Sequence, residues 1–309
     1  MKIYSASYNY PPGFLWGISP GKDFISDPEN YTYLFDLQET GIKAISIYIP
    51  WAEFEPLKGN YDEKRIDAVR LLLSRIRSRN IEPVVILDVG EIPQWQNLEK
   101  SGKNEGFIEE RYQFAANLID ASATYTNYFA VSCSFSSLSS GKQMQAELRM
   151  HKAICDYLHS ISENKFAGTV IPSITAAKKR GGFRNLFGRI QLSALKSNES
   201  DFIAIHMDND SFSDVQSALE EKKEPILFLY EGLKTAAPNE KSNDLMDKLF
   251  DIWQIYQRGW RVLGLLSEMD IKSPSKEKEL YAISSKNNAF EISTENPELP
   301  EKWVRFLKD

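Results

Sequence analysis

The sequence is poor in the side chains on which disulfide-rich and metal-binding proteins depend. Its 309 residues include only 2 Cys and 3 His. Two cysteines, Cys133 and Cys155, do not make a disulfide framework, and we expect both to be small buried residues of a protein in a reducing compartment. No spacing of His, Cys and carboxylates resembles a metal site. The sequence therefore predicts no metal and no other cofactor.

Long apolar runs and an excess of positive charge are also missing. No apolar run approaches membrane-spanning length, and residues 1–10 lack the basic and apolar pattern of a secretion signal. The 37 Lys and Arg against 43 Asp and Glu give a formal net charge of -6. This balance argues against nucleic acid as the main partner. We therefore expect a soluble, cytoplasmic protein that acts neither at a membrane nor on nucleic acid.

Apolar residues are abundant and are arranged in short segments. They make up 42% of the chain, with 17 Phe and 14 Tyr, which is enough for a large core. Nearly continuous apolar segments are typical of parallel strands that are covered by helices. The segments that we expect to be strands are 14–19, 43–49, 83–87, 128–135, 168–174, 202–207, 225–229 and 261–266.

Amphipathic stretches separate these segments. In 63–79, Ile66, Val69, Leu73 and Ile76 recur at helical spacing. Further helices are expected at 31–40, 107–123, 141–162, 215–221, 243–257 and 301–307. Eight strands with intervening helices and no linker predict an α/β fold, a single (β/α)8 TIM barrel over residues 1–309. His151 falls within 141–162, where we expect a surface or core-edge position.

Three stretches of the sequence resemble one known family. They are PPGFLWGIS near the start, the segment 33–96 with GIKAISIYIPWAEFEP, GNYDEKRID and NIEPVVILDVGEIPQW, and GWRVLGLLSEMD near the end. All three are similar to motifs of glycoside hydrolase family 1, the β-glucosidase family. The resemblance implies a (β/α)8 barrel whose ligand site lies at the carboxyl ends of the strands.

The catalytic motifs of that family are changed here. A retaining glycosidase uses two carboxylates about 5 Å apart. The resemblance implies an acid/base on the fourth strand, where Ser134 stands, and a nucleophile on the seventh strand, where Tyr230 stands. Glu231 follows one residue later. Because strand side chains alternate between faces, we expect Glu231 to point away from the barrel axis, unless a bulge restores its direction.

The sugar-binding positions that the resemblance implies are also altered. Ser46 replaces an Arg, Leu263 replaces a Trp, and Asp270 alone keeps its chemical type. His206 stands where the family has Asn, and it could bind a ligand hydroxyl, act as a base or make a structural hydrogen bond. Trp95 could stack on a sugar ring. The candidate site residues are Glu231 for catalysis and His206, Tyr230, Asp270, Trp95 and Ser134 for substrate binding.

A basic loop runs from Lys178 to Arg189 and contains five basic residues, with Phe183 and Phe187 between them. It could bind phosphate, an acidic sugar or a protein partner, or be a solvated loop without a ligand.

The favoured interpretation is a family-1-like barrel that binds a small-molecule sugar or glycoside without hydrolysing it, a pseudoenzyme. One alternative is an active retaining O-glycosidase that uses Glu231 with a relocated acid, either Asp88, Asp208 or Asp270. Another is a different reaction at the same barrel mouth that uses Cys133, His206 or Tyr230. The link to sugars rests on the resemblance alone.

Overall fold

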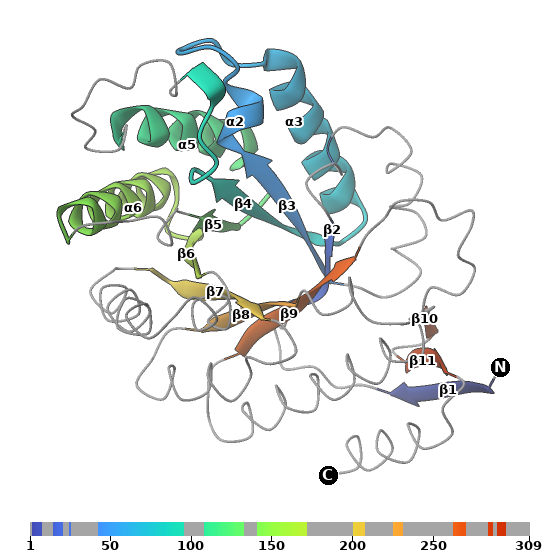
Figure 1. Ribbon diagram of the computed structural model, residues 1–309. Coiled ribbons are helices and arrows are strands. Elements are labelled where there is room, and N and C mark those ends of the chain that lie inside the picture. The colour runs from blue at the N-terminus through green and yellow to red at the C-terminus, as the bar shows by residue number, and fades with distance from the viewer. Residues whose placement is uncertain are drawn as a thin grey trace.

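The computed structural model contains a closed barrel of eight strands (Figure 1). It describes residues 2–7, 15–20, 25, 43–95, 108–132, 141–171, 200–207, 225–230, 262–269, 284–286 and 289–294. The barrel strands are β2 (Leu15–Pro20), β3 (Ala44–Pro50), β4 (Glu82–Asp88), β5 (Tyr128–Ser132), β6 (Phe166–Ile171), β7 (Phe202–Met207), β8 (Ile226–Tyr230) and β9 (Val262–Met269). Each strand pairs in parallel with its neighbours, and β9 pairs with β2. The predicted (β/α)8 fold is confirmed.

The described helices are α2 (Trp51–Phe54), α3 (Glu63–Ser78), α5 (Ile108–Ser122) and α6 (Gly141–Ile161). Figure 1 shows α3, α5 and α6 on the outside of the barrel. Helix α3 begins after Asp62, whose side chain accepts hydrogen bonds from the backbone N–H groups of Lys64 and Arg65. The helix then buries one apolar face, which includes Ile66 and Leu73. The helices expected at 31–40, 215–221, 243–257 and 301–307 lie outside the described residues.

A second, smaller sheet joins the two ends of the chain. Strand β1 (Lys2–Ser7) pairs antiparallel with β11 (Ala289–Thr294), which also pairs with β10 (Ser284–Lys286). The sequence analysis did not predict these three strands. The pairing of β1 with β11 joins residues almost the whole chain apart, so no local pattern indicates it, whereas β10 and β11 are separated by residues 287 and 288 alone.

Apolar side chains from all eight strands fill the barrel. The interior cluster consists of Leu15, Ala44, Val84, Ile86, Ala130, Val170, Phe202, Ala204, Leu227, Leu229 and Leu266. Three glycines on barrel strands, Gly17, Gly168 and Gly264, have no room for a Cβ atom of their own. A Cβ atom on Gly17 would lie 1.7 Å from the carbonyl oxygen of Ala44, and one on Gly168 would lie 2.3 Å from Cζ of Phe202. The barrel is thus a packed core, and a ligand site has to lie at one of its ends.

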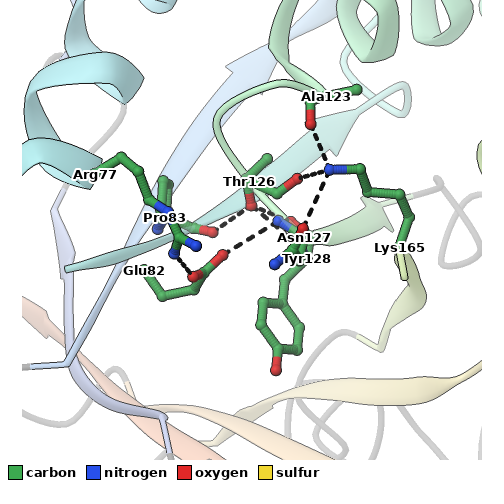
Figure 2. A network of polar contacts seen from close by, with 8 residues as sticks. All are labelled: Arg77, Glu82, Pro83, Ala123, Thr126, Asn127, Tyr128 and Lys165. Atoms are coloured by element: carbon green, nitrogen blue, oxygen red, sulfur yellow. Dashed lines mark hydrogen bonds and ion pairs between the residues drawn. The ribbon is translucent and has the colours of Figure 1, made fainter. Parts of the chain in front are cut away.

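The amino ends of β4, β5 and β6 are held together by polar contacts (Figure 2). The ammonium group of Lys165 donates to the carbonyl oxygens of Thr126, at 2.8 Å, and Ala123, and to Oδ1 of Asn127 at 3.1 Å. The backbone N–H of Asn127 donates to Oε1 of Glu82 at 3.1 Å. In a (β/α)8 barrel this end contributes stability, whereas sites form at the opposite end. We therefore assign this network a structural role.

His151 on α6 is completely buried, with 0% of its surface exposed. Its Nε2 is 2.6 Å from Oγ1 of Thr169 on β6, and its Nδ1 is 3.5 Å from Sγ of Cys155. The expectation of a surface or core-edge position is therefore wrong. The helical spacing places this side chain on the barrel-facing side of α6, and Thr169 supplies the hydrogen bond that burial requires. Cys155 is buried as predicted.

Candidate functional site

Two polar side chains meet inside the barrel near its carboxyl end. On β3, Tyr48 follows Ala44 and Ser46 on the inward face, because strand residues two apart share a face. On β7, His206 follows Phe202 and Ala204 in the same way. The hydroxyl oxygen of Tyr48 lies 2.7 Å from Nε2 of His206, within hydrogen-bond distance.

This hydrogen bond crosses the barrel axis. Strands β3 and β7 are separated by four steps around the closed barrel in either direction, so they stand opposite each other. The ring centroids of Tyr48 and His206 are 6.3 Å apart, and their planes are tilted by 44°. Tyr48 also packs against the interior cluster below it. The pair therefore lies directly above the apolar core.

The inward side chains one step deeper are closed to solvent. Ser46, Ala204 and Ile86 are all 0% exposed, whereas Tyr48 and His206 are partly exposed. Oγ of Ser46 donates to Oγ of Ser19 at 2.6 Å, so this deeper polar pair is satisfied within the protein. Solvent thus reaches the barrel interior as far as Tyr48 and His206 and stops there.

Two further polar residues end their strands at the same edge. Asp88 is the last residue of β4, on the face that Val84 and Ile86 present to the interior, and it pairs in register with Ser132, the last residue of β5. Both are partly exposed. Oδ1 of Asp88 accepts a hydrogen bond from the backbone N–H of Gly90 at 3.1 Å. The described mouth of the barrel therefore combines a phenol, an imidazole, a hydroxyl and one carboxylate.

Trp95 occupies a different environment. Only 7% of its surface is exposed, and its indole N–H donates to the carbonyl oxygen of Glu55 at 2.8 Å. Trp51 and Trp95 pack edge to face, and their ring centroids are 5.9 Å apart. The ammonium group of Lys58 lies 5.8 Å from the Trp95 ring. A ring that is buried and bonded in this way is placed for packing rather than for stacking on a sugar.

A buried carboxylate organises this cluster. Glu55 is 2% exposed, and its two oxygens accept hydrogen bonds from Nε1 of Trp51 at 2.5 Å and from the backbone N–H of Gly59 at 2.7 Å. Gly59 has a φ of +71°, a conformation that glycine adopts without strain. The motif WAEFEP and the following turn thus fix the segment after β3, which is a structural task.

Comparison with known proteins identifies the fold. No protein-family model and no curated protein sequence matches the chain. Among solved structures, the β-glucosidase from Thermotoga maritima in complex with glucoimidazole aligns with a TM-score of 0.63 and 12% identity, over 85% of this chain and 89% of that one. The β-glycosidase from Pyrococcus horikoshii aligns with a TM-score of 0.61 and 14% identity, over 85% and 86%. The β-glycosidase BGL167 aligns with a TM-score of 0.65 and 13% identity, over 84% of this chain and 87% of that one.

The chain has the barrel fold of the β-glycosidases. At these levels of sequence identity the likeness concerns the fold alone. It agrees with the fold implied by the sequence motifs.

Several predicted site residues lie outside the described residues, namely Glu231, Asp270, Ser134, Cys133 and the basic loop Lys178 to Arg189. The side chain of Tyr230 is also outside them.

The face to which each residue of β8 belongs can be assigned, because Leu227 and Leu229 belong to the interior cluster. Odd-numbered positions of this strand therefore face the barrel axis, whereas the sequence analysis had assumed the opposite phase. The phase was misassigned because residues 226–229 are all apolar and show no alternation.

His206 lies at the mouth, and its role as a ligand-binding residue stays a prediction. Tyr48 was missed by the sequence analysis. The only signal was the alternation of the strand: Ala44, Ser46 and Tyr48 share one face, and every residue between them is an isoleucine on the other face.

Within the described ranges, no group of three His, Cys, Asp or Glu side chains is arranged to hold a metal ion. Among the helices that the structure describes, none is long and apolar enough to cross a membrane.

Proposed function

We propose that this protein binds a sugar or glycoside at the carboxyl ends of its barrel strands and does not hydrolyse it. Its fold is that of the β-glycosidases, and the Thermotoga maritima β-glucosidase of that fold has been solved with glucoimidazole, noeuromycin and castanospermine. The observation that carries the proposal is the partly exposed Tyr48–His206 pair at the mouth. Phenol and imidazole groups offer a hydroxylated ligand both hydrogen bonds and apolar ring surface.

The absence of hydrolysis follows from what replaces the acid. Ala130 places the even-numbered residues of β5 on the inward face, and the strand ends at Ser132. Ser134, the next even-numbered residue, is the one that the resemblance puts at the acid/base position. The pKa of a serine hydroxyl is far from the working range of a general acid, so it does not protonate a leaving oxygen usefully near neutral pH. We therefore propose Ser134 and Asp270 as ligand-binding residues, whereas Tyr230 stands at an even-numbered position of β8, out of phase with the inward Leu227 and Leu229.

The phase of β8 favours a second candidate, an active retaining O-glycosidase. If the alternation of Leu227 and Leu229 continues by one step, Glu231 belongs to the inward set. Glu231 would then be the nucleophile, and a carboxylate about 5 Å away would have to act as the acid. In the described part of the mouth, Asp88 has the required phase on β4. This candidate differs from the first in one measurable property, the release of a leaving group.

A paired measurement of cleavage and binding tests the proposal. The chain is incubated with para-nitrophenyl glycosides of several sugars, and its melting temperature is measured with glucoimidazole and castanospermine. We expect no release of nitrophenol above the uncatalysed rate. A ligand at a hundredfold excess over its Kd stabilises the folded state by about 2.7 kcal/mol and raises the melting temperature. If no sugar or sugar-like ligand changes the melting temperature, the proposed function is wrong.

A matched pair of variants separates the two candidates if cleavage is seen. Glu231→Gln removes the candidate nucleophile, and Glu163→Gln changes an exposed Glu after α6 that precedes β6 at the opposite end of the barrel. Cleavage that disappears in the first variant and persists in the second establishes the glycosidase. Cleavage that is equal in both variants removes Glu231 from the reaction.

A further inference from the structure

The Tyr48–His206 pair stands at the boundary between the packed core and the mouth. We propose that this pair forms the floor of the ligand site and that Tyr48, together with His206, recognises one hydroxyl group of a neutral, ring-shaped ligand. This inference rests on the proposed function and assigns the specificity of the site to a residue that the sequence motifs do not mark. Three properties of the pair support it: depth, position and chemistry.

Depth is shown by the change of exposure along the two strands. Tyr48 and His206 are partly exposed, whereas Ser46 and Ala204, two residues earlier on the same faces, are 0% exposed. The polar groups below the pair already bond each other, since Ser46 donates to Ser19 at 2.6 Å. A ligand that enters along the barrel axis therefore cannot bind deeper than Tyr48 and His206.

The position of the pair is central. Because β3 and β7 stand opposite each other in the closed barrel, their hydrogen bond occupies the axis and not one wall. Sites in this fold are built from residues at the ends of several strands, around the axis. A ligand bound by Asp88 on β4 and by residues at the ends of other strands thus has the pair beneath it. The length of the Tyr48 side chain sets how deep the ligand sits.

The chemistry of the pair matches a hydroxyl group. A phenol oxygen both donates and accepts hydrogen bonds, so it can bind a ligand hydroxyl while it stays bonded to His206. A ligand hydroxyl has the same dual capacity, whereas a phosphate or carboxylate only accepts when it is ionised. The two rings, tilted by 44°, also present apolar surface to the C–H groups of a sugar ring. Asp88, at the end of β4, disfavours an anionic ligand at the same mouth.

Two substitutions test the inference. Tyr48→Phe removes the hydroxyl oxygen and keeps the ring, and His206→Gln keeps hydrogen-bonding capacity and removes the imidazole. Loss of one neutral hydrogen bond to the ligand weakens affinity by roughly three- to tenfold. Affinity for glucoimidazole, castanospermine and methyl β-glucoside is measured by isothermal titration calorimetry. The melting temperature and near-UV circular dichroism of each ligand-free variant show that it is folded.

Matched controls come from the same chain. Tyr128→Phe makes the same change in a tyrosine that packs against the interior cluster from the amino end of β5. His159→Gln changes a histidine on α6 that pairs with Asp201 outside the barrel, with Nε2 and Oδ2 2.8 Å apart. Neither side chain lies at the mouth, so both controls keep the affinity of the unchanged protein.

The outcomes are distinct. Binding by the unchanged protein, with a three- to tenfold loss in Tyr48→Phe and His206→Gln and no loss in the two controls, supports the inference. Equal binding by all variants overturns the inference and leaves the proposed function standing. An equal loss in the controls also overturns it, because the effect would then not be local to the mouth. No binding by the unchanged protein overturns the proposed function and the inference together.

Discussion

His151 makes the folded chain sensitive to mild acid. Its imidazole is 0% exposed between α6 and β6, bonded to Thr169 and close to Cys155. Burial lowers the pKa of His151 from 6.5 to about 4, and a hydrogen bond to the backbone of Gly168 opposes this shift only in part. The folded protein therefore holds the neutral imidazole at pH values where an exposed histidine accepts a proton.

The sign of the effect follows from this difference in proton binding. Between pH 6.5 and pH 4 the unfolded chain binds a proton at His151 that the folded chain does not bind. The free energy of unfolding is therefore unaffected by His151 above this range and falls as the pH decreases through it. Each unit of pKa difference corresponds to about 1.4 kcal/mol, and titration between pH 7 and pH 5 removes roughly 2 kcal/mol of stability.

Urea unfolding at pH 7 and pH 5 measures the effect, with His151→Gln as the reference. Every other ionisable group is the same in both proteins, so its contribution cancels in the comparison. We expect the unchanged protein to lose about 2 kcal/mol more than the variant over this interval. Equal losses would refute a buried neutral His151, as would an NMR titration that gives this imidazole a pKa near 6.5.

Three further substitutions test other parts of the described structure. Gly168→Ala places a Cβ 2.3 Å from the Phe202 ring and is expected to destabilise the barrel by about 1–3 kcal/mol in chemical denaturation; unchanged stability would contradict the close packing of β6 on β7. Lys165→Met removes the donor to three acceptors at the amino end of the barrel, and we expect a loss of about 1–3 kcal/mol with unchanged ligand binding. Trp95→Phe loses the hydrogen bond to Glu55 and is expected to lower stability by about 1 kcal/mol; weaker sugar binding at unchanged stability would show instead that the ring contacts the ligand.

The strands could be predicted well because burial on both sides leaves a strong sequence pattern. Strand β7 begins and ends where the apolar segment 202–207 does. Strand β6 starts two residues before the predicted segment, at Phe166, a residue that is 42% exposed. This residue stacks on Tyr128 at the amino end of the barrel, with 5.1 Å between ring centroids. A neighbour from another strand, rather than the local pattern, fixes that boundary.

The candidate site was much less predictable, since it depends on contacts between distant residues. Tyr48 and His206 are 158 positions apart in the chain, and only barrel closure brings them together. The phase of β8 was not readable because each residue from 226 to 229 is apolar. Trp95 carries an aromatic ring suited to a sugar, but its burial depends on Glu55 and Trp51. Residue type indicates what a side chain can do, whereas packing decides whether a ligand can reach it.

The central claim is that the barrel mouth binds a glycoside and leaves it intact. Proton NMR of the protein with a large excess of methyl β-glucoside measures both properties in one sample. Saturation transfer from the protein to the ring protons reports binding, and the anomeric signals report cleavage. We predict saturation transfer that is weaker in Tyr48→Phe than in the unchanged protein, with no new anomeric signals after prolonged incubation. Anomeric signals of free glucose that grow with the unchanged protein and not with Glu231→Gln would contradict the account.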